Sequence, residues 1–199
     1  MIFLDIETTG LDPRKNSIVS IGAVDYIGPH HFYEECRIWK GAEISQEALN
    51  INGFTPEQIT NTNKLSQKEI LENLIDWTHK IIDITLAGEN IAGFDLQFLK
   101  ESFTRECLKS PFGHRTDDLH SIARNHYMRR GISPPLVKNK SSINLDSTLI
   151  YVGLPPEPKP HNALRGAILE AEAYHRLTYG RGYLAEFREF EIPKYLEHR

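Results

Sequence analysis

The sequence has little of what marks secreted or membrane-spanning proteins. Only two cysteines are present, Cys36 and Cys107, and their number and separation predict reduced thiols in a cytoplasmic protein. No apolar run approaches the roughly 18 residues that a bilayer-spanning helix needs, and no secretory signal is visible at the start of the chain. Despite nine histidines, the cysteine spacing does not support a zinc site. We therefore expect a cytoplasmic protein with no membrane partner.

An excess of positive charge is also missing. The net charge of −4 argues against a protein that coats nucleic acid through bulk electrostatics. It does not exclude an enzyme that meets a polyanion at a metal-filled cleft, where bound cations cancel the local carboxylates. The length of 199 residues, with 40% apolar and 25% charged residues, is typical of one soluble globular domain.

Two acids interrupt the first apolar run of the chain. Residues 2–6 are typical of a central strand, yet Asp5 lies within them and Glu7 follows. Because successive strand side chains alternate faces, Asp5 and Glu7 point the same way. Two such carboxylates repel each other and lose hydration, which favours a divalent cation such as Mg²⁺ or Mn²⁺ between them. The alternative is a strand that ends in two ordinary surface acids.

The remaining chain mixes strand-like and helix-like patterns and predicts an α/β layer fold. Strands are expected at residues 2–7, 17–26, 31–38 and 84–87. Helices are expected at residues 45–52, at 55–57 as a single turn, at 65–82, from 95 onward, and at 118–128, 145–152 and 163–177. Residues 129–142 are typical of a loop.

Three further polar features are weak when taken singly. Asp95 follows Asn90-Ile-Ala-Gly-Phe at the start of a helix, where a carboxylate is commonly an N-cap. His161 precedes the last long helix, where a lone histidine is more often a cap or a surface residue than a base. The pair Asp117-Asp118 is either a further acid pair or a helix start, and we favour the helix start.

Together these motifs resemble the DEDDh branch of the 3′–5′ exonucleases, typified by epsilon-like proofreading subunits of DNA polymerases. The first motif is FLDIETTGLD at 3–12, the second is NIAGFDLQFL at 90–99, and the third is PHNALRGA at 160–167. The resemblance implies an RNase H-like fold, with a mixed sheet of about five strands flanked by helices. It assigns residues 1–180 to an exonuclease-like domain and leaves a tail, 181–199, whose packing is not predicted.

The same resemblance implies metal-dependent hydrolysis of phosphodiester bonds at the 3′ end of DNA or RNA. Asp5, Glu7 and Asp95 would hold two Mg²⁺ or Mn²⁺ ions. His161 would be the general base, a role that suits an unperturbed pKa near neutrality. The expected partner is a single-stranded or 3′-ended nucleic acid, while a polymerase or repair partner stays unidentified.

Substrate contacts follow from the first motif. Main-chain groups around Thr8 and Thr9 would meet the terminal nucleotide, and Leu11 would wedge against its base. Basic residues further along the chain either follow a phosphate backbone or form an ordinary solvated loop. These residues are Arg124, Arg129, Arg130, Lys138 and Lys140.

The third motif departs from the family pattern at Gly166. The family places a fourth metal-binding aspartate five residues after the histidine, at the position of Gly166 here. Glu170, one turn later on the same helix face, is the nearest substitute, whereas the alternative makes Glu170 and Glu172 a solvated face. Arg165 is a candidate to offset lost metal charge or to contact phosphate. We expect a weakened exonuclease or, as a second hypothesis, a catalytically impaired nuclease-fold protein that binds nucleic-acid ends or a protein partner.

Overall fold

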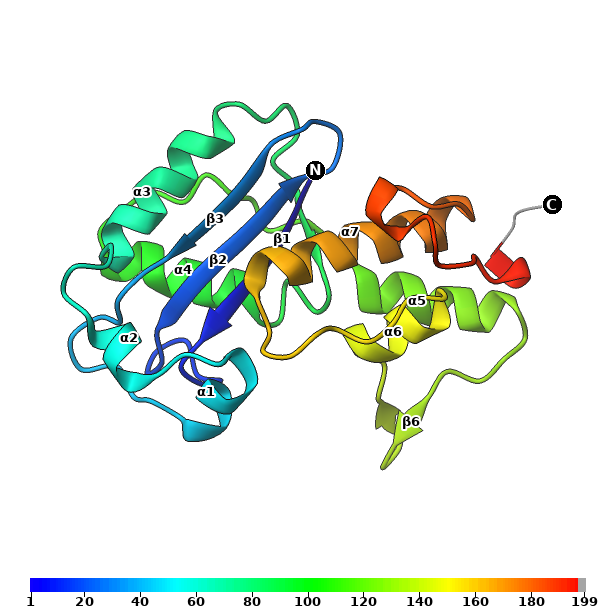
Figure 1. Ribbon diagram of the computed structural model, residues 1–199, viewed down its shortest axis with the longest axis horizontal. Coiled ribbons are helices and arrows are strands. Elements are labelled where there is room, and N and C mark those ends of the chain that lie inside the picture. Colours follow the sequence, from blue (N-terminus) through cyan, green and yellow to red (C-terminus); the bar gives the residue numbers. More distant parts are fainter. Residues whose placement is uncertain (197–199) are drawn as a thin grey trace.

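The computed structural model describes residues 1–196, which form a mixed sheet between two layers of helices (Figure 1). The sheet strands are β1 (Ile2–Thr8), β2 (Ile18–Asp25), β3 (His31–Glu35), β4 (Leu86–Gly88) and β5 (Thr116–Asp118). The helices are α1 (Gln46–Asn52), α2 (Pro56–Thr60), α3 (Gln67–Thr78), α4 (Asp95–Arg105), α5 (Leu119–Arg129), α6 (Leu145–Tyr151) and α7 (Ala163–Tyr179). A separate hairpin, β6 (Leu136–Val137) and β7 (Lys140–Ser141), and two 3₁₀ turns, η1 (Ala185–Phe187) and η2 (Lys194–Leu196), complete the described chain.

The order of strands in the sheet places β1 at the centre. The order is β3-β2-β1-β4-β5, with β1 antiparallel to β2 and parallel to β4. Because β1 and β4 are parallel, their carboxyl ends lie at the same edge of the sheet. The segment after β4 therefore reaches the end of β1, and the mixed five-stranded α/β fold expected from the sequence is confirmed. None of the helices within residues 1–196 is long and apolar enough to cross a bilayer.

Side-chain alternation along β1 separates the two helical layers. Ile2, Leu4 and Ile6 pack with buried residues of α3 and α4. Phe3 points to the opposite face, where it packs with Ala167 and Ala171 of α7. Asp5 and Glu7 share the parity of Phe3, so they face the α7 layer.

Small residues bring α7 close to the sheet. A Cβ added at Gly22 of β2 would lie 2.1 Å from the backbone nitrogen of Leu164, so only glycine permits this approach. The first turn of α7 consequently lies directly on β2. This contact carries the segment before α7, including His161, to the carboxyl end of β1.

Several predicted boundaries differ from the structure. Strand β5 was not predicted, because it has three residues, two of them acids, and shows no apolar alternation. Asp118 ends β5 and also caps α5, where its Oδ1 accepts a hydrogen bond from the Ser121 backbone N–H at 2.9 Å, so the predicted helix start is confirmed. The predicted loop 129–142 contains the hairpin β6–β7, whose two-residue strands are too short for a periodic pattern.

The tail whose packing the sequence leaves open is held by a buried ion pair. Arg176 of α7 is 1% exposed, and its Nε donates to Glu172 Oε1 at 2.7 Å. The same guanidinium donates to the backbone oxygens of Val152, Phe187 and Phe190. The other oxygen of Glu172 accepts the Leu184 N–H at 2.8 Å. Residues 181–196 thus pack on α7, while 197–199, the end of the predicted tail, lie outside the described residues.

We predict that Arg176→Met destabilises the protein strongly. The substitution leaves the Glu172 carboxylate, which is 0% exposed, without its cation, and breaking a buried pair costs about 3–5 kcal/mol. Urea unfolding followed by circular dichroism measures the loss. Arg188→Met, at an exposed arginine of the same tail, is the matched control and should change the free energy of unfolding by about 0.5 kcal/mol or less. Equal losses in the two variants would contradict the anchoring role of Arg176.

Candidate active site

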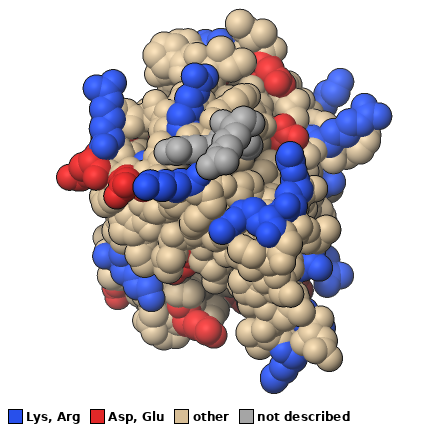
Figure 2. All heavy atoms as spheres, turned by 90° about the vertical axis from the view of Figure 1, so that its right-hand side faces the viewer, with Lys and Arg blue, Asp and Glu red and all other residues tan. Residues whose placement is uncertain are grey.

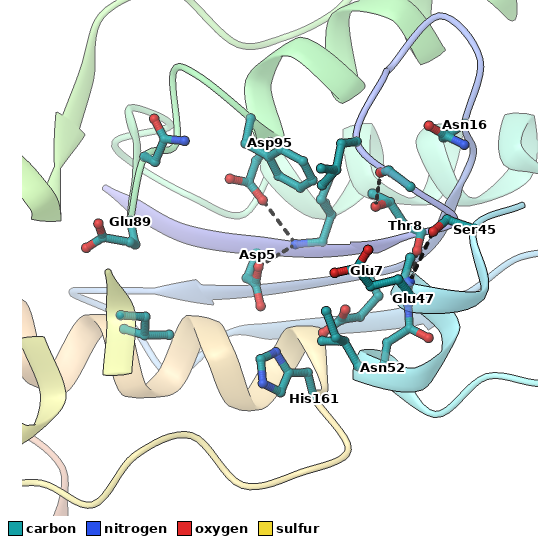
Figure 3. Close-up of a pocket in the computed structure, with 18 of the residues that line it drawn as sticks. Asp5, Glu7, Thr8, Asn16, Ser45, Glu47, Asn52, Glu89, Asp95 and His161 are labelled. Atoms are coloured by element: carbon teal, nitrogen blue, oxygen red, sulfur yellow. Dashed lines mark hydrogen bonds between the residues drawn. The ribbon is translucent and has the colours of Figure 1, made fainter. Parts of the chain in front are cut away.

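Asp5 and Asp95 are drawn together by one backbone donor. The Ile6 N–H donates to Asp5 Oδ1 at 2.9 Å and to Asp95 Oδ1 at 3.2 Å (Figure 3). Asp95 is the first residue of α4, whereas the N-cap is Phe94, which has no side-chain capping bond. The capping alternative for Asp95 is therefore wrong. Asp95 is 4% exposed and lies in the wall of the cavity beside Asp5.

Gly166 leaves the room that the Asp5 carboxylate occupies. A Cβ added at Gly166 would lie 2.1 Å from Asp5 Oδ2, well inside any permitted contact. Any side chain at this position requires Asp5 to turn away. The Asp5 side chain can therefore keep its present direction only because residue 166 has no side chain.

Glu170 lies in the same cluster of acids. It is 4% exposed, and its Oε1 accepts the Glu89 backbone N–H at 2.8 Å. Its Oε2 is buried and has no hydrogen-bond partner among the described residues. Glu172 is also buried, so the alternative that these two glutamates form a solvated face is wrong.

Sequence reasoning missed a further acid, Glu157. It comes from the proline-rich segment before α7, and its side chain is 6% exposed. Its Oε2 lies 3.4 Å from His161 Nδ1, while its Oε1 is buried without a partner among the described residues. No periodicity marks this segment, so the only sequence signal was a glutamate four residues before the histidine. Glu89, at the end of β4, also lines the cavity and was not predicted.

Burial and mutual repulsion raise the pKa values of these acids. Burial is the main reason that the pKa of Glu7 rises to about 8, with Glu157 and Asp95 adding repulsion. Burial likewise raises the pKa of Asp95 to about 8. The pKa values of Asp5 and Glu170 rise well above their ordinary values, first through burial and then through neighbouring carboxylates. Such a cluster is stable as anions only when a cation accompanies it.

The donor set fits a hard divalent cation. Carboxylate oxygens are the ligands that Mg²⁺ and Mn²⁺ prefer, and three buried carboxylate oxygens, on Glu89, Glu157 and Glu170, have no partner among the described residues. Arg165 does not supply the missing charge, because it pairs with Glu186 Oε2 at 2.6 Å. Within residues 1–196, no three acidic, histidine or cysteine side chains already enclose a coordination point.

His161 lies across the cavity from Asp5 and Asp95 (Figure 3). Its backbone N–H donates to Ile51 O at 3.0 Å, which ties it to α1. The cap of α7 is Asn162, whose Oδ1 accepts the Arg165 N–H, so the capping alternative for His161 is wrong. Burial lowers the pKa of His161, which favours a neutral imidazole able to accept a proton.

Residues 2–171 match the family model of RNase T, described as exonuclease. The chain belongs to the RNase T exonuclease family. It is 31% identical over 178 residues to the PolC-type DNA polymerase III of Thermotoga maritima, a match that covers 89% of this chain and 12% of that protein. It is 31% identical over 191 residues to the DNA polymerase III subunit epsilon of Rickettsia prowazekii, covering 90% of this chain and 74% of the subunit.

The fold of this exonuclease-family chain is also similar to that of a solved nuclease domain over nearly its whole length. The nuclease domain of 3′hExo, a DEDDh family member bound to rAMP, aligns with a TM-score of 0.68 and 18% identity. The alignment covers 97% of this chain and 95% of that domain. By contrast, the chain spans only about an eighth of the PolC-type polymerase, at 12% of its length.

The cavity of this exonuclease-family member has a volume of about 560 Å³ and an apolar side. Leu11, which is 82% exposed, lies in its wall together with Ile44 and Ile51. Thr8 also lines the cavity. Thr9 does not: it is fully buried, its hydroxyl donates to Glu43 O at 2.7 Å, and its backbone N–H donates to Ser17 O. The structure thus places Thr8 and Leu11 at the cavity and Thr9 behind its wall.

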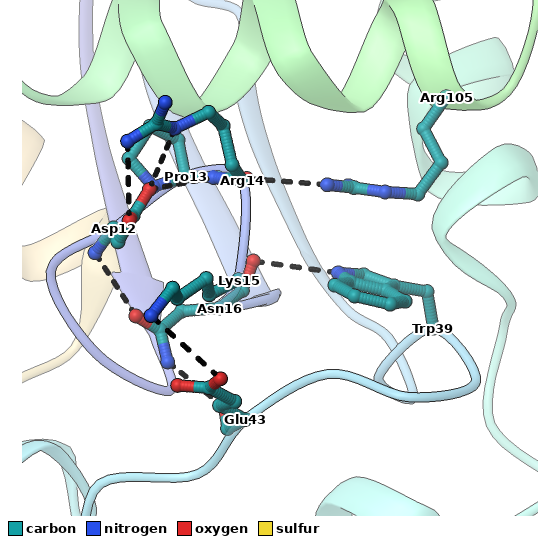
Figure 4. Close-up of polar contacts among 8 residues, drawn as sticks. All are labelled: Asp12, Pro13, Arg14, Lys15, Asn16, Trp39, Glu43 and Arg105. Atoms are coloured by element: carbon teal, nitrogen blue, oxygen red, sulfur yellow. Dashed lines mark hydrogen bonds and ion pairs between the residues drawn. The ribbon is translucent and has the colours of Figure 1, made fainter.

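The loop that presents Leu11 is braced from two sides (Figure 4). The Asn16 side chain accepts the Asp12 N–H at 2.9 Å and donates to Glu43 O at 2.9 Å. Arg105 of α4 donates to Pro13 O at 3.2 Å and stacks 4.4 Å from the centre of the Trp39 ring. The exposed Leu11 is therefore carried by a fixed loop, which lowers the entropic cost of any contact it makes.

We predict that divalent cations stabilise the protein more at alkaline than at acidic pH. Because the pKa of Glu7 in the folded state, about 8, exceeds its ordinary value of 4.5, the folded protein binds more protons between these values. The metal-free protein therefore loses stability as pH rises from 4.5 towards 8. A cation at about 100 times its Kd restores about 2.7 kcal/mol, equivalent to roughly 5–10 °C in Tm.

Thermal unfolding with and without Mn²⁺, at about pH 6 and about pH 8, measures this difference. The shift in Tm should be larger at the higher pH, where fewer protons compete with the ion. The variant Asp5→Asn/Asp95→Asn is the control and should show little shift at either pH. A shift of equal size at both pH values would contradict the assignment of these raised pKa values to the binding site.

Proposed function

We propose that the protein is a metal-dependent 3′–5′ exonuclease that hydrolyses the terminal phosphodiester bond of DNA or RNA. The observation that carries this proposal is the meeting of Asp5 and Asp95 at one backbone N–H, opposite His161, in a cavity with an apolar side. Membership of the exonuclease family supports the reaction class. The name of the epsilon relative, a DNA polymerase subunit, favours DNA as the first substrate to test. We also propose a cytoplasmic location, which the free thiols of Cys36 and Cys107 support.

We propose that Asp5, Glu7, Asp95 and Glu170 hold the Mg²⁺ or Mn²⁺ ions. Bound divalent cations lower the pKa of an attacking water and stabilise the leaving 3′ oxygen. In this proposal Gly166 replaces the fourth family aspartate, and Glu170 supplies the missing charge from one helical turn away. Its partnerless Oε2 and its repulsion of the Asp5 carboxylate support that assignment.

His161 accepts the proton of the attacking water in the proposed reaction. Its lowered pKa keeps the ring neutral near pH 7, and its position across from the acids leaves the nucleophile between them. Glu157 orients the ring through the contact of its Oε2 with Nδ1, which turns Nε2 towards the substrate. Leu11 wedges against the terminal base, while the Thr8 segment meets the nucleotide and Thr9 braces that segment from behind.

We predict that Glu170→Gln lowers the rate of 3′-end shortening at least about 100-fold and weakens Mn²⁺ binding. The amide keeps the volume and can still accept the Glu89 N–H, so only the charge is lost. Asp5→Asn should abolish the reaction. Glu47→Gln, at an exposed acid of the cavity rim, is the matched control and should retain full activity. The assay follows a 5′-labelled single strand in Mn²⁺, with Gly166→Asp as a further variant.

The activity of Gly166→Asp distinguishes a site that Glu170 completes from a site that is impaired because residue 166 is glycine. Because its Cβ would collide with Asp5 Oδ2, we expect this variant to lose activity rather than gain it. A large gain would contradict the role of Glu170 and show that the glycine is a lesion. Unimpaired activity in Glu170→Gln would do the same.

We predict that Glu157 and His161 act as one unit. Glu157→Gln should lower kcat about 10-fold, and His161→Ala should lower it about 100-fold or more. The double variant should be no slower than His161→Ala, because Glu157 acts only through the ring. Rates of the four proteins at saturating Mn²⁺ test this cycle. Additive losses, or a changed Mn²⁺ affinity in Glu157→Gln, would instead make Glu157 a direct ligand.

A second candidate function is a nuclease-fold protein that binds ends without cleaving them. The glycine at 166 and the acids that do not yet enclose an ion favour this candidate. A protein that binds a labelled strand, yet leaves it intact at every Mg²⁺ and Mn²⁺ concentration tested, would establish it and refute the exonuclease proposal.

A further inference from the structure

One stretch of the chain departs from its overall negative charge. Residues 119–145 contain no aspartate or glutamate, although the whole chain has 27 acids and a net charge of −4. The same stretch carries the arginines of α5 and the lysines of the β6–β7 hairpin. These cations are Arg124, Arg129, Arg130, Lys138 and Lys140, which we call the basic strip.

Most of the basic strip has no neutralising partner. No ion pair within residues 1–196 involves Arg124, Arg129, Lys138 or Lys140. Many lysines and arginines elsewhere also lack an ion pair, so what distinguishes the basic strip is the absence of acids between residues 119 and 145. Arg130 has no ion pair either, but it donates to the Tyr151 hydroxyl and stacks 3.7 Å from the centre of the Tyr195 ring. Figure 2 looks onto the end of the molecule that carries α5, the hairpin and the tail, where Lys and Arg side chains are more prominent than Asp and Glu on a largely uncharged surface.

The hairpin projects from the body of the protein with its lysines at the tip. Lys138 and Asn139 occupy the two central positions of the turn, with φ of 48° and 62°, the conformation of a type I′ turn. Glycine and asparagine favour such a conformation, whereas lysine has to be held there. Leu136 and Val137 are 55% and 60% exposed, so the hairpin presents aliphatic groups beside its cations.

The hairpin is joined by a short segment, residues 142–144, to the start of α6, which reaches the cavity. The ring Nε2 of His120 lies 2.8 Å from the Ser141 hydroxyl, which fixes β7 to the first turn of α5. Leu145, four residues after β7, lines the cavity itself, as does Glu89 at the end of β4. In Figure 1 the hairpin lies below α6 and to the right of α1. The hairpin is therefore a candidate contact for the part of a strand that stays outside the cavity.

We propose that the basic strip binds the phosphate backbone of the substrate strand, several nucleotides upstream of the 3′ end held in the cavity. Cations without partners are free to displace counterions from a phosphate backbone, which is the main source of affinity for single strands. The exposed Leu136 and Val137 pack against unstacked bases between those phosphates. This inference rests on the proposed exonuclease function for the direction of the strand, but its binding test does not require hydrolysis.

The test compares Lys138→Gln/Lys140→Gln with Lys68→Gln/Lys100→Gln. Both pairs remove two exposed lysines and the same charge, but the control pair lies on α3 and α4. Binding of a fluorescent single strand of about 20 nucleotides is measured in chelator, so that no hydrolysis occurs. The hairpin variant should bind about 10-fold more weakly, and its slope of log affinity against log salt should fall by about 1.4, the value for two lost phosphate contacts. The control should match the natural protein.

Cleavage assays in Mn²⁺ extend the test to strand length. The hairpin variant should show a raised KM for the long strand and an unchanged rate on a dinucleotide, which is too short to reach the hairpin. Equal binding by the two double variants would overturn the proposal, as would a slowed dinucleotide reaction or a loss confined to duplex substrates. A natural protein that binds through the hairpin but never cleaves would refute the exonuclease function and leave the basic strip standing.

Discussion

The site depends on one shared donor, the Ile6 N–H, which makes hydrogen bonds to the carboxylates of both Asp5 and Asp95. The two acids repel each other, and burial penalises both. A single donor cannot offset that cost alone, so the surrounding fold holds them in place. Parallel pairing of β1 with β4 delivers Asp95 to the end of β1, and the buried layer of α3 and α4 fixes that pairing from below. The folded sheet thus holds together buried acids whose ionised forms are unfavourable without a cation.

Close packing of α7 on the sheet sets the second constraint. Gly22 and Gly166 both face neighbouring groups that a Cβ would meet at 2.1 Å. The same approach brings Glu170 within 3.0 Å of the Cβ position of Gly88. The helix therefore cannot carry a side chain at 166 while Asp5 keeps its direction, and the nearest acid that fits is one turn further on. In the proposed site, Glu170 would supply the charge that Gly166 lacks, because the longer glutamate side chain leans back towards the N-terminus of the helix.

Regular patterns in the sequence predicted part of this site and irregular contacts decided the rest. Alternation along a strand predicted that Asp5 and Glu7 share a face, and motif order predicted that Asp95 and His161 join them. Glu157 had no such signal, because a proline-rich segment has no period and its place depends on how α7 packs. Thr9 shows the reverse case: its motif suggested a substrate contact, yet the turn at the end of β1 uses its hydroxyl and its N–H internally. Strand alternation predicts which way a side chain points, whereas contacts between distant parts of the chain decide which side chains reach the cavity.

The charge distribution explains why net charge alone is a poor guide to this protein. The acids gather in the cavity, where burial makes them costly and a divalent cation can neutralise them. Residues 119–145, which contain α5 and the hairpin, carry cations and no acids, so a polyanion would meet no like charge from that stretch of chain. In the proposed complex a nucleic-acid strand would meet both regions with the same chemistry, since each of its phosphates needs a positive neighbour. One region would supply that charge through bound metal and the other through side chains, so a chain of net charge −4 can still follow a polyanion along its length.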